Sequence, residues 1–478
     1  MRLRLQALTR KHVPATGCLI YRSAIICFLI LIFSCLVKFS KAQSLSFTVK
    51  QVLTQLQNNL PLLRSYQENI KAQQYNIDLA KNSLMPDLTV GYQAGSVTYN
   101  NIIGMNYPGL IMPITGPASS GNSYNFVPET ALAGLLKWNP ISFGQRTAAI
   151  EKANSQFKLA NAGYHDQLFK QQFQAITIYL NILYLKKVLF SLDRNIERSQ
   201  VGLEQSLILA KKGLRPGIDS TEFQSALVNA EIEYFNTEKS YAAQKVELSR
   251  LLGLNIPIEE INLTDTSFAN QLPIVPDTTG SFINNPTYQL YQSEKELGAA
   301  SLNEIDKSWM PKLDIWANAF ARGSGVEYTG LINKADGWSL SRNNYGIGVQ
   351  LSFPVLQFAR VNIQKKQYSS QLQSEEALLA QASIDISKQI ETASHNLQQD
   401  LRIAALGPLQ LKAAADAYFG LQVSYRAGLI DYTRLVESQY AFLQAEIGQV
   451  RANIQAWRSL LELAIAKGDL NILLDQLK

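Results

Sequence analysis

The feature of this sequence that most constrains its fold is an internal duplication. Residues 59–97 align without a gap on residues 284–322. Further along the chain the match continues at an offset of 214 to 215, and it pairs Gly213-Leu214 with Gly428-Leu429. A repeat of about 215 residues is far longer than a solenoid unit of about 20–50 residues. The chain is therefore predicted to contain two copies of one domain-sized unit, related by pseudo-symmetry.

The duplication also predicts how the chain is divided. Each repeat should contain a helix, a β-hairpin and a long helical hairpin, in that order. The expected segments are a signal peptide at 1–42, a first repeat at 43–253 with its β-hairpin at 86–140, a linker at 254–283, a second repeat at 284–468 with its β-hairpin at 311–355, and a C-terminal tail at 469–478.

The N-terminal segment has the order of regions that is typical of a secretory signal peptide. Basic residues precede an apolar run from Ala24 to Val37 that only Ser34 interrupts, and small and polar residues follow. About 14 apolar residues are fewer than the roughly 20 that a helix needs to span a bilayer. We therefore expect cleavage near Ala42 rather than a permanent anchor. A lipoprotein leader acylated at Cys35 is an alternative that the sequence leaves open.

Removing the leader changes the balance of charges. The chain has 44 Lys and Arg against 38 Asp and Glu; the leader holds seven of the basic and none of the acidic residues, which leaves 37 against 38. A mature chain so close to neutrality gives no sign of a nucleic-acid partner. All three cysteines (Cys18, Cys27 and Cys35) also lie in the leader. The mature chain therefore lacks disulfides and thiolate sites, which suits an oxidising compartment.

Two very long helices are predicted, one in each repeat. No proline occurs from about 142 to 212, and apolar residues recur there at spacings of three and four, which is the helical period. About 65 residues of helix would be about 100 Å long. The second copy should run from about 361 to 426, and Pro408 should kink it.

Each long helix should end at a short turn and be followed by a returning helix. The turns are 213–217 and 427–431, and both contain a Gly-Leu pair. Apolar residues of the second returning helix recur every seven residues, which indicates coiled-coil packing: Val436, Leu443, Val450, Trp457 and Ala464. Helices of this length cannot form a compact globule, so we expect projecting hairpins or a bundle.

The segments between the helices alternate with a period of two, which is typical of membrane β-strands. In the last of them the apolar positions, expected to face lipid, are Tyr345, Ile347, Val349 and Leu351. The other expected strands are 88–98, 130–139 and 313–321, and long loops at 100–128 and 323–342 join the pairs. Which side chains of 130–139 share the apolar face stays undefined, and a soluble hairpin is the alternative for any single pair.

Four such strands cannot form a pore alone. Even eight strands enclose an interior that side chains about fill, and an open sheet edge in lipid leaves backbone groups unpaired. Four strands per chain therefore require several copies, and three copies would supply twelve strands.

The order of these elements, performed twice, resembles the TolC-type outer-membrane efflux proteins over the whole mature chain. The motifs that carry the resemblance are the Asn-Asn and Pro before each helix, the Met-Pro that opens each hairpin, the Gly-Leu turns, and the joints at 140–146 and 354–360. The resemblance implies mainly α structure with a β-barrel part: a homotrimeric α/β barrel with four transmembrane strands per chain and a helical tunnel through the periplasm.

The resemblance also suggests functional residues. The turn residues Gly213, Leu214, Gly428 and Leu429 would form exposed tips that dock a periplasmic adaptor protein. In family members with an acidic gate, two acids three residues apart follow the second turn. Here these positions hold Arg434 and Glu437, and Glu222 is the first-repeat counterpart of Glu437. One acid is thus replaced by a base, so solvated charges are an alternative to a gate.

No catalytic, cofactor or metal site is expected. The only histidines outside the leader, His165 and His395, lie in different long helices and have no ligand spacing. The main prediction is a passive outer-membrane exit duct of a tripartite efflux pump or type I secretion system, with an adaptor, an RND or ABC-type inner-membrane pump and outer-membrane lipid as partners. The alternative is a periplasmic coiled-coil protein anchored to the inner membrane by its N-terminal apolar segment.

Overall fold

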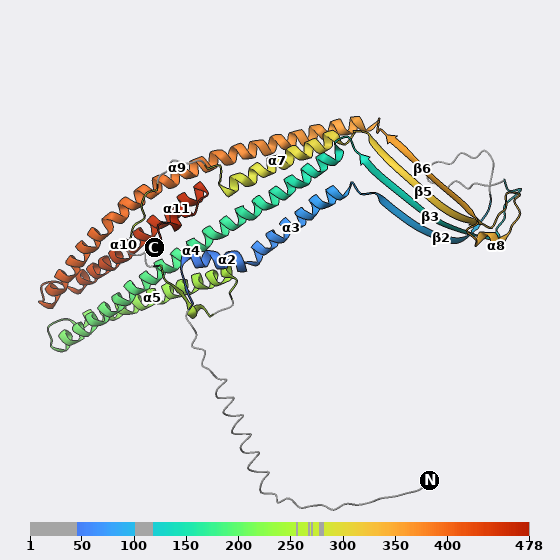
Figure 1. Cartoon of the computed structure of the whole chain (residues 1–478). Coiled ribbons are helices and arrows are strands. Elements are labelled where there is room, and N and C mark those ends of the chain that lie inside the picture. The colour runs from blue at the N-terminus through green and yellow to red at the C-terminus, as the bar shows by residue number, and fades with distance from the viewer. Residues whose placement is uncertain are drawn as a thin grey trace, which may run out of the picture.

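The protein is elongated, with a β-sheet at one end and the tips of two helical hairpins at the other (Figure 1). The computed structural model describes residues 45–100, 118–254, 257–265, 268, 271–276 and 282–477. The predicted signal peptide, its cleavage near Ala42 and the alternative acylation of Cys35 therefore lie outside the described residues.

The two repeats contain the same main elements in the same order. The first repeat comprises β1 (Leu45–Phe47), α2 (Val49–Asn59), α3 (Pro61–Asn82), β2 (Asp87–Thr98), β3 (Phe126–Ile141), α4 (Gln145–Lys211) and α5 (Gly217–Leu252). A short 3-10 turn, η1 (Ile258–Glu260), and β4 (Ile261–Leu263) follow. The second repeat comprises α7 (Pro286–Lys307), β5 (Lys312–Ser324), α8 (Lys334–Gly337), β6 (Arg342–Ser352), α9 (Gln357–Arg426), α10 (Tyr432–Lys467) and α11 (Asn471–Leu474).

The predicted long helices are confirmed, because α4 has 67 residues and α9 has 70. At 1.5 Å per residue each is about 100 Å long. The helix α9 begins a few residues earlier than expected and continues through Pro408, following one continuous arc (Figure 1). Pro61 and Pro286, which the repeats share, occupy the first position of α3 and α7. A helix does not need the N–H that proline lacks there.

The main hydrophobic core lies midway along the molecule, where α2, α4, α5, α9 and α10 meet. Tyr179, Leu180, Leu248 and Trp457 are almost completely buried in it. An 18-residue window of α4 is apolar enough to span a membrane, but 56% of that window is buried inside the fold. The apolar character of α4 is therefore explained by this core.

A small parallel sheet in this core was not foreseen from the sequence. The strand β1 pairs with β4, which lies in the segment predicted as a linker. The Tyr179 hydroxyl donates to the Phe47 carbonyl at 3.0 Å, and Asp265 accepts from the backbone N–H of Val49 at 2.7 Å. Burial raises the pKa of Tyr179. The linker segment and the N-terminal strand thus fix one another to α4.

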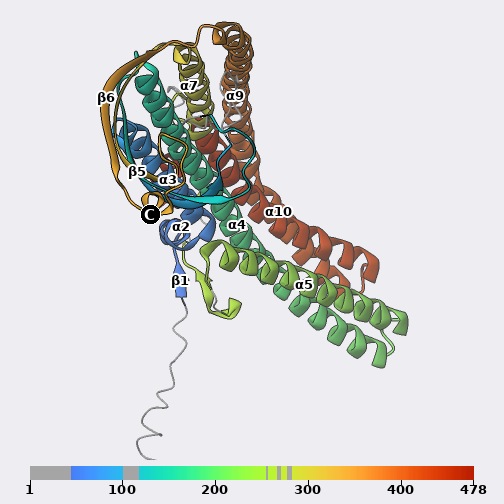
Figure 2. The same ribbon diagram turned by 90° about the vertical axis from the view of Figure 1, so that its right-hand side faces the viewer.

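The four long strands form one antiparallel sheet in the order β2-β3-β5-β6. The sheet is strongly curved (Figure 2). One register shift occurs in β3 between Trp138 and Ile141. Pro140 lies within this shift, and proline is expected at such irregularities because it has no N–H to donate to the ladder. The strands β2 and β6 are the two unpaired edges of the sheet in this chain.

The register decides which residues share a face, since directly paired residues point the same way. Val349 pairs with Ile315, Ile315 with Trp138, and Ile347 with Ala317. Ala317 pairs with Leu136, and Leu136 with Leu88. The parity of β3, undefined from the sequence, is therefore settled: its even-numbered residues lie on the apolar face.

Candidate functional site: the sheet faces and the hairpin tips

In the single chain the apolar face of the sheet is exposed on the edge strands β2 and β6 and partly exposed at most positions of β3 and β5. The side chains predicted to face lipid in β6 are exposed by 91% (Tyr345), 80% (Ile347), 66% (Val349) and 66% (Leu351). Three side chains of β2 on the same face are also largely exposed: Leu88, Val90 and Tyr92. An apolar face that extends across four strands is stabilised by a hydrocarbon environment. The contact of these side chains with lipid stays a prediction.

The opposite face of the sheet is polar. Asn139 donates to Asp314 at 2.7 Å, and Gln93 donates to Glu129 at 3.1 Å. Other polar residues on this face are Lys137, Asn318, Arg322, Asn344 and Gln350. A sheet with one apolar and one polar face suits a barrel whose interior holds water.

Trp316 lies on the polar face of the sheet. It pairs with Gly348, and a Cβ at Gly348 would lie 2.6 Å from the Trp316 indole ring. Gly346 is also close to this ring. The Trp316 indole therefore lies over Gly346 and Gly348, which have no side chains.

The two predicted docking tips have the same local structure. Gly213 and Gly428 have positive φ angles of 71° and 80°. The N–H of Leu214 donates to the Leu209 carbonyl at 2.9 Å, and that of Leu429 donates to the Ser424 carbonyl at 2.9 Å. These bonds are those of a Schellman motif, in which glycine adopts the left-handed conformation without strain. Each glycine is therefore explained by helix termination.

The leucines at the tips need a different explanation. The Leu214 side chain is 66% exposed, and the Leu429 side chain is 77% exposed. Neither helix termination nor the core of this chain requires an apolar residue there. Exposed apolar side chains at equivalent positions of both hairpins are typical of a surface that contacts another protein.

The tips of the two hairpins are joined within the chain. The Arg215 guanidinium donates to the carbonyls of Tyr425 at 3.2 Å and Ile430 at 2.6 Å. It also lies over the Tyr425 ring, 4.8 Å from its centre. The Tyr425 hydroxyl donates to Asp219 at 3.2 Å. Burial, together with the charge of Asp219, raises the pKa of Tyr425 to about 12, so Tyr425 keeps its donor proton at neutral pH.

Asp219 was not singled out in the sequence. The repeat could have revealed it, because the offset of 215 residues pairs Asp219 with Arg434, just as it pairs Glu222 with Glu437. The pair Asp219 and Glu222, three residues apart, thus stands in the first repeat where Arg434 and Glu437 stand in the second. Asp219 is buried, whereas Glu222 is exposed.

The three residues predicted as a gate lie beside the tips. Glu222 is on α5, and Arg434 and Glu437 are on α10; all three are exposed, and none forms an ion pair within the described part of the chain. The Arg434 backbone N–H donates to Asp431, which caps α10, at 3.1 Å. The charges of Glu222 and Asp219, after burial, contribute to raising the pKa of Tyr432 to about 12. A gate role for these residues stays a prediction.

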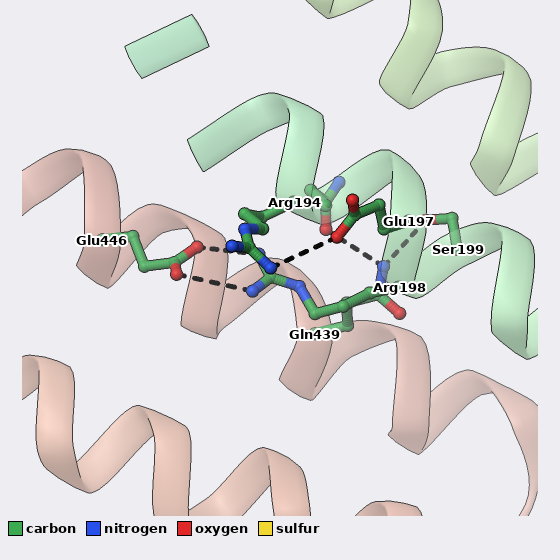
Figure 3. A network of polar contacts seen from close by, with 7 residues as sticks. Arg194, Glu197, Arg198, Ser199, Gln439 and Glu446 are labelled. Carbon is green, nitrogen blue, oxygen red and sulfur yellow. Dashed lines mark hydrogen bonds and ion pairs between the residues drawn. The ribbon is translucent and has the colours of Figure 1, made fainter. Parts of the chain in front are cut away.

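A buried polar layer joins the two hairpins further from the tips (Figure 3). The Gln439 amide on α10 donates to Asn195 at 3.0 Å and to Ser199 at 2.8 Å on α4. Beside it, Arg198 of α4 binds Glu446 of α10 with two hydrogen bonds, of 2.7 and 3.4 Å. The Arg198 side chain is only 17% exposed, and Glu446 is 21% exposed. Buried polar pairs of this kind fix the register of one helix on another.

Removing Arg198 should destabilise the protein. In Arg198→Ala the Glu446 carboxylate is left half-buried without its partner, which should cost about 1–3 kcal/mol. Arg194→Ala is the matched control, because the Arg194–Glu197 pair on the same helix is exposed and should be worth less than about 1 kcal/mol. Adding Glu446→Leu to Arg198→Ala should recover much of the loss. The measurement is the thermal unfolding midpoint by circular dichroism; equal effects of both arginine variants would contradict the expectation.

The described residues contain no group of three or more His, Cys, Asp and Glu side chains that could hold a metal ion. The features above are surfaces and helix contacts, and they supply no arrangement of nucleophile, base and oxyanion donor. What the geometry does supply is an amphipathic curved sheet that continues into long helices.

The comparisons with known proteins agree with this geometry. Three solved outer-membrane proteins superimpose on most of the chain. The outer-membrane channel OprN is 13% identical with a TM-score of 0.72, and the alignment covers 88% of this chain and 89% of OprN. VceC from Vibrio cholerae is 14% identical with a TM-score of 0.70, and the alignment covers 88% of this chain and 96% of VceC. The CmeC outer membrane channel of Campylobacter jejuni is 11% identical with a TM-score of 0.71, and the alignment covers 88% of this chain and 85% of CmeC. At these identities the likeness shows the fold alone.

Sequence similarity to a known family covers the first repeat. Residues 52–254 match the family model described as outer membrane efflux protein. They span nearly all of the first repeat, from α2 to the end of α5, and the second repeat has the same order of elements. Over that stretch the chain is similar to the outer membrane efflux protein family, which confirms the resemblance found in the sequence. The comparison with curated proteins found no similar sequence.

The structural likeness confirms the predicted fold class, which is mainly α with a β part. The matched family model describes outer membrane efflux proteins, and the three solved structures are of outer-membrane proteins.

Proposed function

We propose that this chain is an outer-membrane channel whose helices extend into the periplasm. It works as a homotrimer and forms the passive exit duct of a tripartite efflux pump or a type I secretion system. The observation that carries the proposal is the four-stranded sheet with one apolar face and two unpaired edges. Open edges in hydrocarbon leave backbone N–H and C=O groups without partners. Pairing β6 of one copy with β2 of the next would remove every edge, and three copies would make twelve strands.

The helices continue the same duct. Because α4 and α9 are each about 100 Å long and start directly after β3 and β6, they would extend the barrel through most of the periplasm. The tips then lie far from the outer membrane. Docking of a periplasmic adaptor on the tips, together with an RND or ABC-type pump in the inner membrane, would open the duct and supply the energy.

The proposal can be tested with the purified protein and with cell fractions. We expect the protein in the outer-membrane fraction, and a trimer in mild detergent that dissociates on heating. Reconstituted trimers should give stepwise single-channel conductance in a planar bilayer. An inner-membrane location, or one copy per detergent particle, would contradict the proposal and favour a coiled-coil protein anchored by its N-terminal apolar segment.

A further inference from the structure

A carboxyl group lies between α7 and α9, two helices that connect the sheet to the core. Glu375 is on α9, and Gly298 is a buried residue of α7. A Cβ at Gly298 would overlap the Oε2 atom of Glu375. The absence of a side chain at Gly298 therefore lets the Glu375 carboxyl rest against the α7 backbone.

The surroundings of the Glu375 carboxyl stabilise its ionised form poorly. Its Oε2 atom is buried and has no hydrogen-bond partner among the described residues. The Gln371 side chain, one turn away on α9, bonds to the carboxyl. An ionised carboxylate with one buried, unpaired oxygen is unfavourable, whereas a protonated carboxyl carries no charge to desolvate.

The charges around Glu375 act in the same direction. Glu294 on α7 is the charged group that acts on it electrostatically, and its charge has the same sign. The neighbouring cation, Lys295, is bound to Glu376 at 3.2 Å. Burial raises the pKa of both Glu294 and Glu375, and the charge of Glu294 raises that of Glu375 further.

The contact between Glu375 and Gly298 lies between two helices that are directly connected to the sheet. The helix α7 leads into β5, and α9 follows β6, so the pair supports the β5–β6 hairpin (Figure 1). An open groove of about 790 Å³ begins next to the contact, between the same two helices. Its lining includes Ala299, Leu302, Asp306 and Lys365.

We propose that the Glu375 carboxyl is a proton-dependent contact that holds α7 to α9. In its protonated form it packs against Gly298 without charge. When it ionises, Glu294 repels it and the buried oxygen lacks a partner, so α7 separates more readily from α9. A group whose pKa is raised by folding stabilises the folded state at low pH, and this contribution is lost as pH rises through the raised pKa. Acidification therefore tightens the support of the β5–β6 hairpin.

Hydrogen–deuterium exchange of the purified full-length protein tests the proposal, independently of any export assay. Each wild-type rate is compared with that of Glu375→Gln, a permanently neutral analogue, at the same pH. Peptides from residues 286–307 should exchange alike in both proteins at pH 5. At pH 8 they should exchange severalfold more slowly in Glu375→Gln, because only the wild-type carboxyl is then ionised. Glu376→Gln, which breaks only the Lys295 pair, should not reproduce this slowing.

A second variant tests the contact itself. Gly298→Ala places a methyl group where Oε2 lies and should accelerate exchange of the same peptides at both pH values. Combining it with Glu375→Ala, which makes room, should relieve that effect. Faster exchange in Glu375→Gln at pH 8 would overturn the proposal, because it would mean that a cation, for example from a second copy, pairs with the carboxylate. Unchanged exchange at pH 8 would also overturn it.

Discussion

Export is expected to be lost when Leu214 and Leu429 are both replaced by Asp. These side chains are exposed apolar groups at the two hairpin tips, 66% and 77% accessible in the single chain. An apolar hot spot at the centre of an interface commonly contributes 2 kcal/mol or more, and burying a carboxylate in its place adds a desolvation cost. The two tips recur in every copy of a trimer, so the losses multiply. The measurement is export by a strain in which the variant is the sole copy.

The structure supplies the controls for this experiment. Lys212→Asp changes charge next to the first tip without removing an apolar side chain, and Leu214→Met keeps an apolar one. Both should export normally. The Schellman bonds at the tips involve only backbone groups, so the Leu214→Asp and Leu429→Asp proteins should still reach the outer membrane as trimers. Loss of the trimer would indicate a folding role, and normal export would show that the tips are not the docking surface.

Assembly in the outer membrane is expected to fail when Val349 is replaced by Arg. Val349 lies on the apolar face of β6, is 66% exposed, and pairs with Ile315. An arginine facing lipid near the middle of the membrane costs about 2–4 kcal/mol per chain. The cost is repeated in each copy of a trimer. The measurement is the amount of heat-dissociable trimer in the outer-membrane fraction.

The adjacent residue is the matched control. Gln350 lies on the polar face, paired with Asp314, so Gln350→Arg should assemble and instead change the single-channel conductance. Gly348 is on the same face but would be a poor control. A side chain there collides with the Trp316 ring, so Gly348→Arg should impair assembly as well. Equal assembly defects at Val349 and Gln350 would contradict the assignment of the two faces.

Local patterns in the sequence were enough to predict the main elements of the fold. A proline-free stretch with helical periodicity predicted α4, and apolar alternation predicted β6. The Gly-Leu pairs predicted both turns. These predictions succeed because helix and strand geometry repeats every 3.6 and 2 residues, so each element leaves its own period in the residues that form it. The duplication then indicated that each pattern occurs twice.

The tertiary structure decided what depends on partners far away in the sequence. The apolar face of β3 followed from its pairing with β2 and β5, not from its own residues. Likewise, β4 exists as a strand only because β1 lies beside it. Nothing in a segment of three residues reveals a partner more than 200 residues away.

The repeats themselves show the same limit. Gln439 and Glu446 on α10 correspond to Gln224 and Glu231 on α5. In the second repeat Gln439 is buried and Glu446 is half-buried in the polar layer against α4, whereas Gln224 and Glu231 are exposed. The sequence determined that these residue types recur at equivalent helical positions. Only packing decided which copy meets Arg198 and Ser199, because burial and pairing belong to the neighbouring helix and not to the residue.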